Sequence, residues 1–416
     1  MKLNQKRTIL VGLAFLSISA FWQIYDNGIP ILLANKFHLE AGVIGIIMSI
    51  DNILALLLLP LFGILSDKTA TRFGKRMPFI ILGTGFASFF MVLIPLGANI
   101  NNFPLFVISL SITLLAMSSY RSPAVALMPD VTPKEHRSKA NAIINLMGAL
   151  GGIISLLVIK LLLQNNDDNY LKIFIAVAII MVVSVLVLSI FINENKLAQE
   201  IAHEAEEKET KATGKLEKPV FKSLIFLLFS VAFWFIGYNA VTTAFSRYAD
   251  HVFNMKDYSS PLLVATAASI VAFLPIGIIS SKVGRKKMIL SGILLLGTAW
   301  TIVGFITSYT GFINIILALV GIAWAMINVN SYPMVVEMSQ SGDIGKYTGY
   351  YYTFSMSAQV FTPILSGYLI QYLGYRVLFP YAAIFTFLAF FTMQMVKHGD
   401  NKPQAKAGIE AFEDFD

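Results

Sequence analysis

Apolar stretches of about 20 residues or more recur along most of this sequence, and they restrict the possible folds more than any other feature. At a rise of 1.5 Å per residue, about 20 helical residues cross the roughly 30 Å hydrocarbon core of a bilayer. Hydrophobic residues make up 56% of the chain and charged residues only 13%. Soluble domains carry about 25% charged residues, so this chain has too few charges to cover a water-exposed surface. We therefore predict an all-α polytopic membrane protein.

The apolar stretches predict twelve transmembrane helices in two pseudo-symmetric bundles of six. A charged segment, "NENKLAQEIAHEAEEKETKATGKLEKP", is too polar to insert and separates the bundles. We expect an N-terminal bundle over 1–193, a cytoplasmic linker over 194–219, a C-terminal bundle over 220–397 and a cytoplasmic tail over 398–416. The predicted spans are 8–33, 41–66, 78–98, 104–129, 138–163, 171–193, 220–247, 259–281, 286–308, 311–336, 345–371 and 376–397.

The positive charges set the expected orientation. With both termini in the cytoplasm, 24 of the 31 Lys and Arg residues fall on the cytoplasmic side, as the positive-inside rule requires. Six, including Arg247, fall in the outer segments, and the one that remains is Arg121, near the middle of a span. The net charge of +7 thus indicates contact with membrane lipids, not nucleic acid. We expect a multi-pass protein of the cell membrane whose basic N-terminus leads into an uncleaved first helix.

Two short motifs recur at similar offsets and indicate an internal repeat. The second predicted helix ends in "GILSDKTATRFGKR" and the eighth in "GIISSKVGRKK", so Gly63 and Gly277 occupy equivalent positions in the two motifs. The fourth and tenth helices contain "RSPAVALM" and "NSYPMVVEM", in which Pro123 and Pro333 occupy equivalent positions. The two halves of the chain therefore look like copies of one six-helix unit.

The first motif has the composition of a sharp, basic turn at the cytoplasmic surface. Gly74 and Gly284 allow backbone angles that other residues avoid, and the basic side chains favour the headgroup region. Asp67 can accept hydrogen bonds from this turn, whereas Ser281 replaces the acid in the second copy. We predict that the first turn stabilises the state closed to the cytoplasm. The predicted gating residues are Gly63, Asp67, Arg72, Gly74, Lys75, Arg76, Asp130 and Arg137.

These motifs resemble those of the major facilitator superfamily over nearly the whole chain. More narrowly, "SDKTATRFGKRMPFI" is similar to a signature of the sucrose/proton symporters, a group beside the glycoside–pentoside–hexuronide symporters. "RSPAVALMPDVTPKEHRSKANAIINLMGALGG" fits the pattern that follows their fourth helix. The resemblance implies a bacterial-type permease that moves a disaccharide or glycoside by alternating access, driven by a cation gradient and with no bound cofactor.

Some positions depart from these relatives. In melibiose-type members two aspartates of the second helix hold sodium, but Ala55 and Leu59 stand at those positions here. Sodium coupling by that route is therefore not expected, and a proton gradient is the expected driving force. Plant sucrose members carry an aspartate in the fourth helix where this chain has Leu115, so the proton carrier must lie elsewhere.

Ionisable residues inside the spans are the candidates for coupling. Arg121 lies near the middle of the fourth helix, where an arginine costs at least about 2.5–3.5 kcal/mol, so it requires an acidic partner or a watery cavity. Asp26 and Asp51 are the acids within reach in the same half, and we predict that one of them carries the proton, with Asp26 the first choice. For Arg121 we expect donation to sugar hydroxyls; a purely structural pair that locks helices is the alternative.

We expect the substrate site near the membrane midplane, between the two halves. The seventh helix, "AFWFIGYNAVTTAF", and the tenth, "GIAWAMINVNSYPMV", each carry aromatic and then polar residues at four-residue intervals, so these lie on one helical face. Aromatic rings and amides suit a sugar, although helix packing would also explain them. The predicted substrate-binding residues are Arg121, Gln23, Asn27, Trp234, Tyr238, Asn239, Trp324, Asn328, Asn330, Tyr332, Tyr352 and Gln359.

Three other functions remain open from the sequence. A proton-coupled exporter of drugs or other small solutes would share the fold, but it would favour a more aliphatic midplane. A membrane sugar receptor that does not transport is a second alternative. A membrane enzyme would need clustered metal ligands or a nucleophile with its base; the chain has no cysteine and no evident metal-binding motif. We expect a monomer that is not an enzyme and whose partners are a small sugar and lipids.

Overall fold

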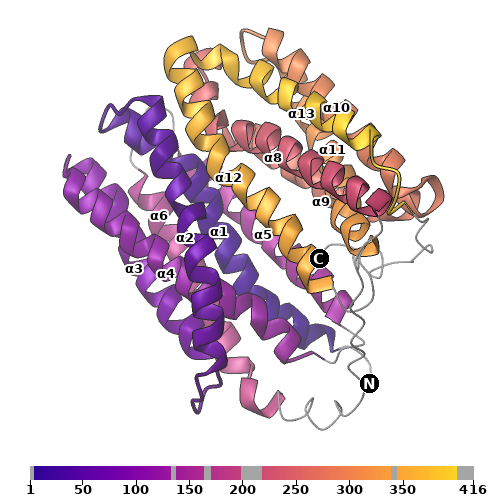
Figure 1. Ribbon diagram of the computed structural model, residues 1–416. Coiled ribbons are helices and arrows are strands. Elements are labelled where there is room, and N and C mark those ends of the chain that lie inside the picture. The colour runs from indigo at the N-terminus through magenta and orange to yellow at the C-terminus, as the bar shows by residue number, and fades with distance from the viewer. Residues whose placement is uncertain (1–3, 133–136, 164–169, 198–217, 339–343, 401–416) are drawn as a thin grey trace. The chain divides into compact units, whose positions relative to one another are not determined.

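A computed structural model describes residues 4–132, 137–163, 170–197, 218–338 and 344–400. Within these ranges, an α-helix overlaps each of the twelve predicted spans, with ends that differ by up to three residues where a helix is shorter than its span (Figure 1). The helices are α1 (Gln5–Asn35), α2 (Ala41–Asp67), α3 (Met77–Asn99), α4 (Phe103–Asp130), α5 (Arg137–Leu162), α6 (Leu171–Phe191), α8 (Lys218–Phe253), α9 (Ser259–Val283), α10 (Arg285–Phe305), α11 (Gly311–Glu337), α12 (Ile344–Leu373) and α13 (Leu378–Gln394), with a short 3₁₀-helix η2 (Tyr375–Val377) before α13. The prediction of an all-α polytopic fold is confirmed.

Ten helices in the described part of the chain are long and apolar enough to cross a membrane. The two others are α9, which contains a shorter apolar helical stretch over Ser259–Phe273 within its 25 residues, and α12, which is 30 residues long but carries many tyrosine, serine and threonine side chains. Large apolar side chains are widely exposed, including Leu57, Val271 and Ile190. Such a surface is unusual for a soluble monomer and fits contact with lipid tails.

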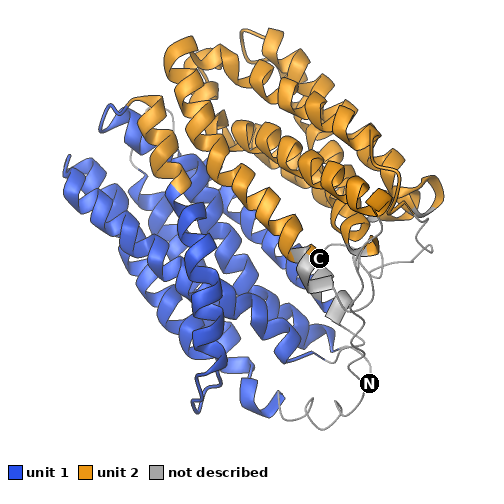
Figure 2. Ribbon diagram, in the orientation of Figure 1, with its two compact units in different colours: residues 1–39, 50–206 blue, residues 40–49, 207–416 orange. Residues whose placement is uncertain are grey.

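The chain divides into two compact units (Figure 2). Unit 1 comprises residues 1–39 and 50–206, and unit 2 comprises residues 40–49 and 207–416. The division after Glu206 falls inside the segment predicted as a linker, most of which lies outside the described residues. Residues 40–49, which include the first turns of α2, belong to unit 2, whereas the sequence predicts them in the N-terminal bundle.

Close packing against α12 explains the position of residues 40–49. A Cβ atom added to Gly45 would lie 2.0 Å from the carbonyl oxygen of Pro363, so the helices touch there through backbone atoms. The backbone N–H of Gly42 also donates to Oε1 of Gln371 at 3.1 Å. Small residues at such contacts let membrane helices approach closely.

The same helix pairings occur within each of the two units. In unit 1, α1 packs on α5 and α6, and α3 packs on α4 and α6. In unit 2, α8 packs on α12 and α13, and α10 packs on α11 and α13. First, third, fourth, fifth and sixth helices therefore pair in the same way in each unit, which supports the internal repeat inferred from the sequence motifs.

Candidate functional site

Three charged side chains of unit 1 lie within electrostatic range of one another, inside apolar helices. Asp26 of α1 interacts with both Asp51 of α2 and Arg121 of α4, and Asp51 also interacts with Arg121. All three side chains are half-buried. Charges within membrane helices normally pair or face a wet cavity, and this cluster supplies the partners predicted for Arg121.

Aromatic side chains of α1 surround this cluster. The guanidinium carbon of Arg121 lies 5.6 Å from the centre of the Trp22 ring, a cation–π contact of the kind worth about 0.5–2 kcal/mol. Trp22 packs edge-on against Tyr25 at 5.3 Å, and Tyr25 interacts with both aspartates. The Tyr25 hydroxyl and the Trp22 indole nitrogen are buried and have no hydrogen-bond partner among the described residues. Both groups therefore have donor capacity that no described residue uses.

The polar neighbours of Asp26 and Asp51 are partly satisfied within their own helices. Asn27 donates through Nδ2 to the carbonyl oxygen of Gln23 at 2.9 Å, while its Oδ1 is buried without a partner in the described part of the chain. Asn52 donates to Oδ1 of Asp51 at 2.9 Å. Asn27 thus keeps an acceptor atom without a partner in the described part of the chain.

Tight packing of α1 holds these side chains in place. A Cβ atom on Gly151 of α5 would lie 2.2 Å from the carbonyl oxygen of Leu16, so the two helices meet backbone to backbone. On another side, Ser17 and Tyr120 share a hydrogen bond of 3.2 Å between α1 and α4. Tyr120 is next to Arg121, so this contact fixes the height of the arginine relative to α1.

Most of the predicted gating residues converge on the guanidinium of Arg76. This side chain is 5% exposed and donates to Asp130 at 2.9 Å, to the carbonyl oxygen of Gly63 at 3.3 Å, and to Ser66 and Asp67. Lys75 adds an ion pair to Asp130 at 3.2 Å. The network ties the end of α2, the start of α3 and the end of α4 together.

The side chain of one predicted gating residue, Arg72, lies outside this network. Arg72 is exposed and lies over the ring of Phe73 at 4.7 Å. The side chain of Arg137 lies outside the described residues. Gly74 has φ of +114°, which confirms the prediction that this turn requires a left-handed backbone.

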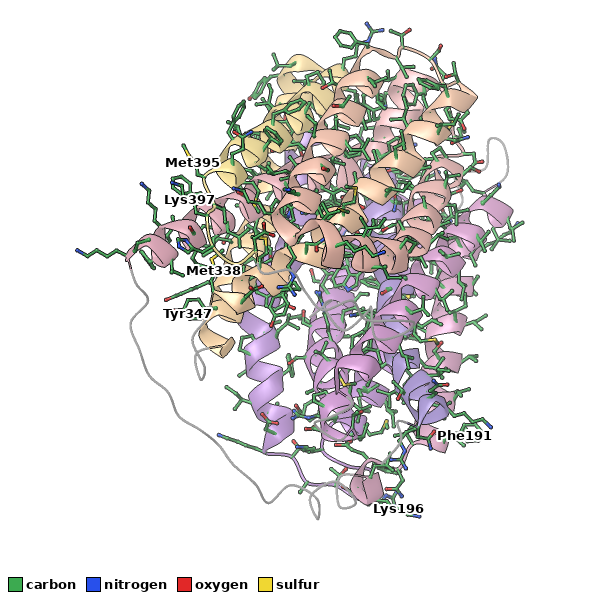
Figure 3. The ribbon with its side chains drawn as sticks, turned by 90° about the vertical axis from the view of Figure 1, so that its right-hand side faces the viewer. Phe191, Lys196, Met338, Tyr347, Met395 and Lys397 are labelled. Carbon is green, nitrogen blue, oxygen red and sulfur yellow. The ribbon has the colours of Figure 1, made fainter. Side chains whose placement is uncertain are left out.

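An acid that the sequence reasoning missed completes the turn. Glu194 follows α6, is 1% exposed, and accepts hydrogen bonds from the backbone N–H groups of Lys75, Arg76 and Met77 at 2.9–3.0 Å. Figure 3 labels Phe191 and Lys196, which flank this segment. A carboxylate is favoured at a helix N-terminus, so Glu194 caps α3 although it lies more than 100 residues later in the sequence.

Unit 2 has a second version of the same turn. Gly284 has φ of +101°, as predicted, and Asp400 accepts a hydrogen bond from the backbone N–H of Lys286 at 2.8 Å. Arg285 forms an ion pair with Glu337 of α11. An acid that follows the last helix thus caps the third helix in each unit.

In unit 2, aromatic side chains of the predicted substrate-binding face pack against one another. Tyr238 of α8 stacks on Trp324 of α11, with ring centres 3.6 Å apart and planes 7° apart. Phe235 packs edge-on against Trp324. One face of each ring is therefore already covered, and Trp234 is fully buried.

The predicted amides of unit 2 differ in how well they are satisfied. Asn328 donates to the carbonyl oxygen of Trp324 at 3.1 Å. Asn330 is buried, donates to the carbonyl oxygen of Met326 at 2.9 Å and accepts from Ser280. By contrast, Nδ2 of Asn239 is buried with no partner among the described residues, which makes Asn239 the amide of α8 with an unused donor.

The remaining predicted residues lie on α11 and α12. Tyr332 packs against Tyr352 with ring centres 6.4 Å apart, and Tyr352 is exposed. Gln359 is half-buried and donates weakly to the carbonyl oxygen of Ser355 at 3.5 Å.

Long apolar helices in two repeated units, with a cluster of ionisable groups inside the membrane-spanning part, are typical of a multi-pass membrane transporter. The family model of the Major Facilitator Superfamily matches residues 11–274 and 258–413. The chain belongs to this superfamily.

Two curated proteins and one solved structure show the range of its relatives. Multidrug resistance protein 2 of Bacillus subtilis (strain 168) is 26% identical over 332 residues, or 73% of this chain and 76% of the relative. Sucrose transport protein SUC3 of Arabidopsis thaliana is 29% identical over 121 residues, or 24% of this chain and 20% of the relative. The crystal structure of the POT family transporter PepTSo has a TM-score of 0.72 at 10% identity and covers 95% of this chain and 98% of that one. This last likeness concerns the fold alone.

Proposed function

We propose that this protein is a secondary active transporter that takes up a disaccharide or glycoside together with protons. The observation that carries the proposal is the cluster of Asp26, Asp51 and Arg121. Two carboxylates share one guanidinium, so the fully ionised cluster has a surplus negative charge. An uncompensated charge is costly in a medium of low dielectric constant, and a single proton removes it. The cluster is therefore suited to bind one proton and release it again.

The cluster can also link proton binding to substrate binding. A hydroxyl-rich substrate beside Arg121 would compete with the carboxylates for the guanidinium N–H groups, because arginine has only donors. Loss of that contact favours a protonated carboxyl group, and protonation in turn releases the arginine for the substrate. Each ligand would then promote binding of the other, which is the requirement for symport.

The choice of a sugar rests on the side chains that the two units offer. Trp22 and Trp324 provide ring faces, whereas Tyr25, Asn27 and Asn239 provide buried polar atoms without partners in the described part of the chain. The resemblance of the turn after α2 to the sucrose/proton symporters supports the same substrate class. One relative that matches part of the chain is named as a sucrose transport protein.

The direct experiment is uptake of labelled disaccharides and glycosides by sealed vesicles that contain the purified protein. With an imposed proton gradient, at least one compound is expected to accumulate above its outside concentration, and a protonophore is expected to abolish the accumulation. Accumulation that persists with the protonophore would contradict proton coupling. Empty vesicles give the background.

Two substitutions separate the roles within the cluster. Asp26→Asn is expected to retain exchange of substrate between the two sides but to lose uphill accumulation, because the amide cannot carry a proton. Arg121→Ala is expected to abolish saturable transport in both assays at near-normal expression. Lys172→Ala, an exposed residue of the same unit, serves as the control. Normal accumulation by Asp26→Asn would move the proton role to Asp51 or outside the cluster.

A proton-coupled multidrug exporter is the second candidate, and one observation favours it. The relative that matches 73% of this chain is named as a multidrug resistance protein, a far longer match than the sucrose transporter provides. The same carboxylate cluster would then bind protons in exchange for an apolar or cationic compound. Cells that express the chain would extrude a fluorescent dye such as ethidium, and they would show no saturable uptake of any sugar.

A further inference from the structure

A second arginine is buried inside a helix of this chain, near the Phe253 end of α8. Counting positive charges assigns Arg247 to the water-exposed ends of the spans, but its side chain is only 4% exposed. The six consecutive residues 244–249 are all buried, so other parts of the protein enclose the helix on every side here. Arginines near helix ends usually extend their charged group to the headgroups, and Arg247 does not.

The guanidinium of Arg247 is incompletely satisfied. Its hydrogen-bond partner is the hydroxyl of Tyr375 in η2, while Nε and Nη1 are buried without a partner among the described residues. The hydroxyl of the adjacent Ser246 is also buried and unpartnered in the same part of the chain. At least two strong donors of Arg247 are therefore buried with no acceptor among the described residues.

The charged groups nearby do not neutralise Arg247. Asp250 acts on Tyr375, and Arg376 acts on Tyr248, but no carboxylate among the described residues contributes to the surroundings of the Arg247 guanidinium. His251 donates through Nδ1 to the carbonyl oxygen of Arg247 at 3.0 Å and stacks on Tyr375 at 4.2 Å. The imidazole covers this end of the site but carries no negative charge.

We propose that Arg247 binds a small monovalent inorganic anion of the chloride class. A buried ion is stable only when it is paired and its hydrogen-bonding groups are satisfied, and a single anion beside Nε and Nη1 would meet both conditions. One uncompensated positive charge calls for one negative charge. Tyr248, the next residue of α8, packs against Phe253 and Phe379, and such apolar neighbours suit a small monovalent ion better than a multiply charged one.

The site is tested by the anion dependence of thermal unfolding of the full-length protein in detergent. Wild-type protein is expected to unfold at a higher temperature in sodium chloride than in sodium gluconate at equal ionic strength, with an effect that saturates with chloride concentration. Arg247→Gln is expected to unfold at the same temperature in both salts. Arg376→Gln, which removes an exposed arginine nearby, is expected to keep the full chloride effect.

Two results would overturn the proposal: no difference between the salts for wild-type protein, or an equal chloride effect in Arg247→Gln. If Arg247→Gln does not fold, crystals of wild-type protein grown in bromide decide the question. An anomalous peak beside the Arg247 guanidinium supports the site, and a water molecule or nothing at that position rejects it. None of these measurements involves transport, so their outcome is independent of the proposed function.

Discussion

Removal of the Glu194 carboxylate is expected to destabilise unit 1 far more than its place after the last apolar helix suggests. In Glu194→Ala, the backbone N–H groups of Lys75, Arg76 and Met77 lose their acceptor. Loss of an ordinary helix cap costs about 0.5–2 kcal/mol, and each buried donor left unsatisfied costs about 1–3 kcal/mol. Because Arg76 and Met77 are buried whereas Lys75 is half-buried, we expect a loss of about 2–5 kcal/mol in the free energy of unfolding.

The measurement is reversible unfolding of the purified protein in mixed micelles of dodecyl maltoside and sodium dodecyl sulfate, followed by tryptophan fluorescence. Glu194→Gln keeps one carbonyl acceptor and is expected to fall between wild type and Glu194→Ala. Lys196→Ala, an exposed neighbour, is the matched control and should resemble wild type. A change below about 0.5 kcal/mol for Glu194→Ala, the usual range of surface substitutions, would refute the capping argument.

Two further substitutions test the packing of the units. Gly151→Ala is expected to lower the unfolding temperature markedly, because its Cβ would lie 2.2 Å from the Leu16 carbonyl oxygen, whereas Gly85→Ala, with nothing within 4 Å, should be neutral; equal unfolding temperatures would contradict the close contact. Tyr238→Ala uncovers a ring face of Trp324 that is stacked at 3.6 Å, so we expect it to shift the fluorescence emission of Trp324. The contribution of Trp324 is obtained by subtracting the spectrum of the Trp324→Phe protein. Unchanged Trp324 emission in Tyr238→Ala would mean that the rings do not stack in solution.

The helices and the charge cluster could be predicted from the sequence because both depend on local composition. An apolar stretch of sufficient length can only be satisfied as a helix in lipid, and every predicted span matches a helix. Arg121 stands out because nothing near it in the sequence explains a charge at that depth. The glycine turns were also predictable, since Gly74 and Gly284 lie at fixed positions in repeated motifs and both have a positive φ.

The parts that could not be predicted depend on contacts between distant segments. Glu194 begins a long charged stretch and looks solvated, but its partners lie more than 100 residues earlier in the chain. Arg247 lies where helix ends usually reach the headgroups, so only the packing of neighbouring elements shows that it is buried. Trp22 and Tyr25 precede Asp26 in "FWQIYDNG", and these aromatic residues were the available signal for the surroundings of Arg121.

The structure also bears on whether Arg121 is only a structural residue. A guanidinium sealed in dry packing would oppose a role in transport, whereas this side chain is half-buried and lies beside Trp22 and two carboxylates. Some of the polar atoms around it have no partner among the described residues. These features agree with a site that binds a polar ligand, and they motivate a direct test of proton movement.

Proton movement during transport tests the central claim most directly. A dense suspension of cells that express the protein, in weakly buffered and anaerobic medium, is given a transported sugar while an electrode records the external pH. Wild-type cells are expected to cause an immediate rise in external pH, and cells with Asp26→Asn are expected to cause none although they still exchange sugar. Sugar uptake by the wild type without any rise in external pH would contradict proton coupling through the Asp26, Asp51 and Arg121 cluster.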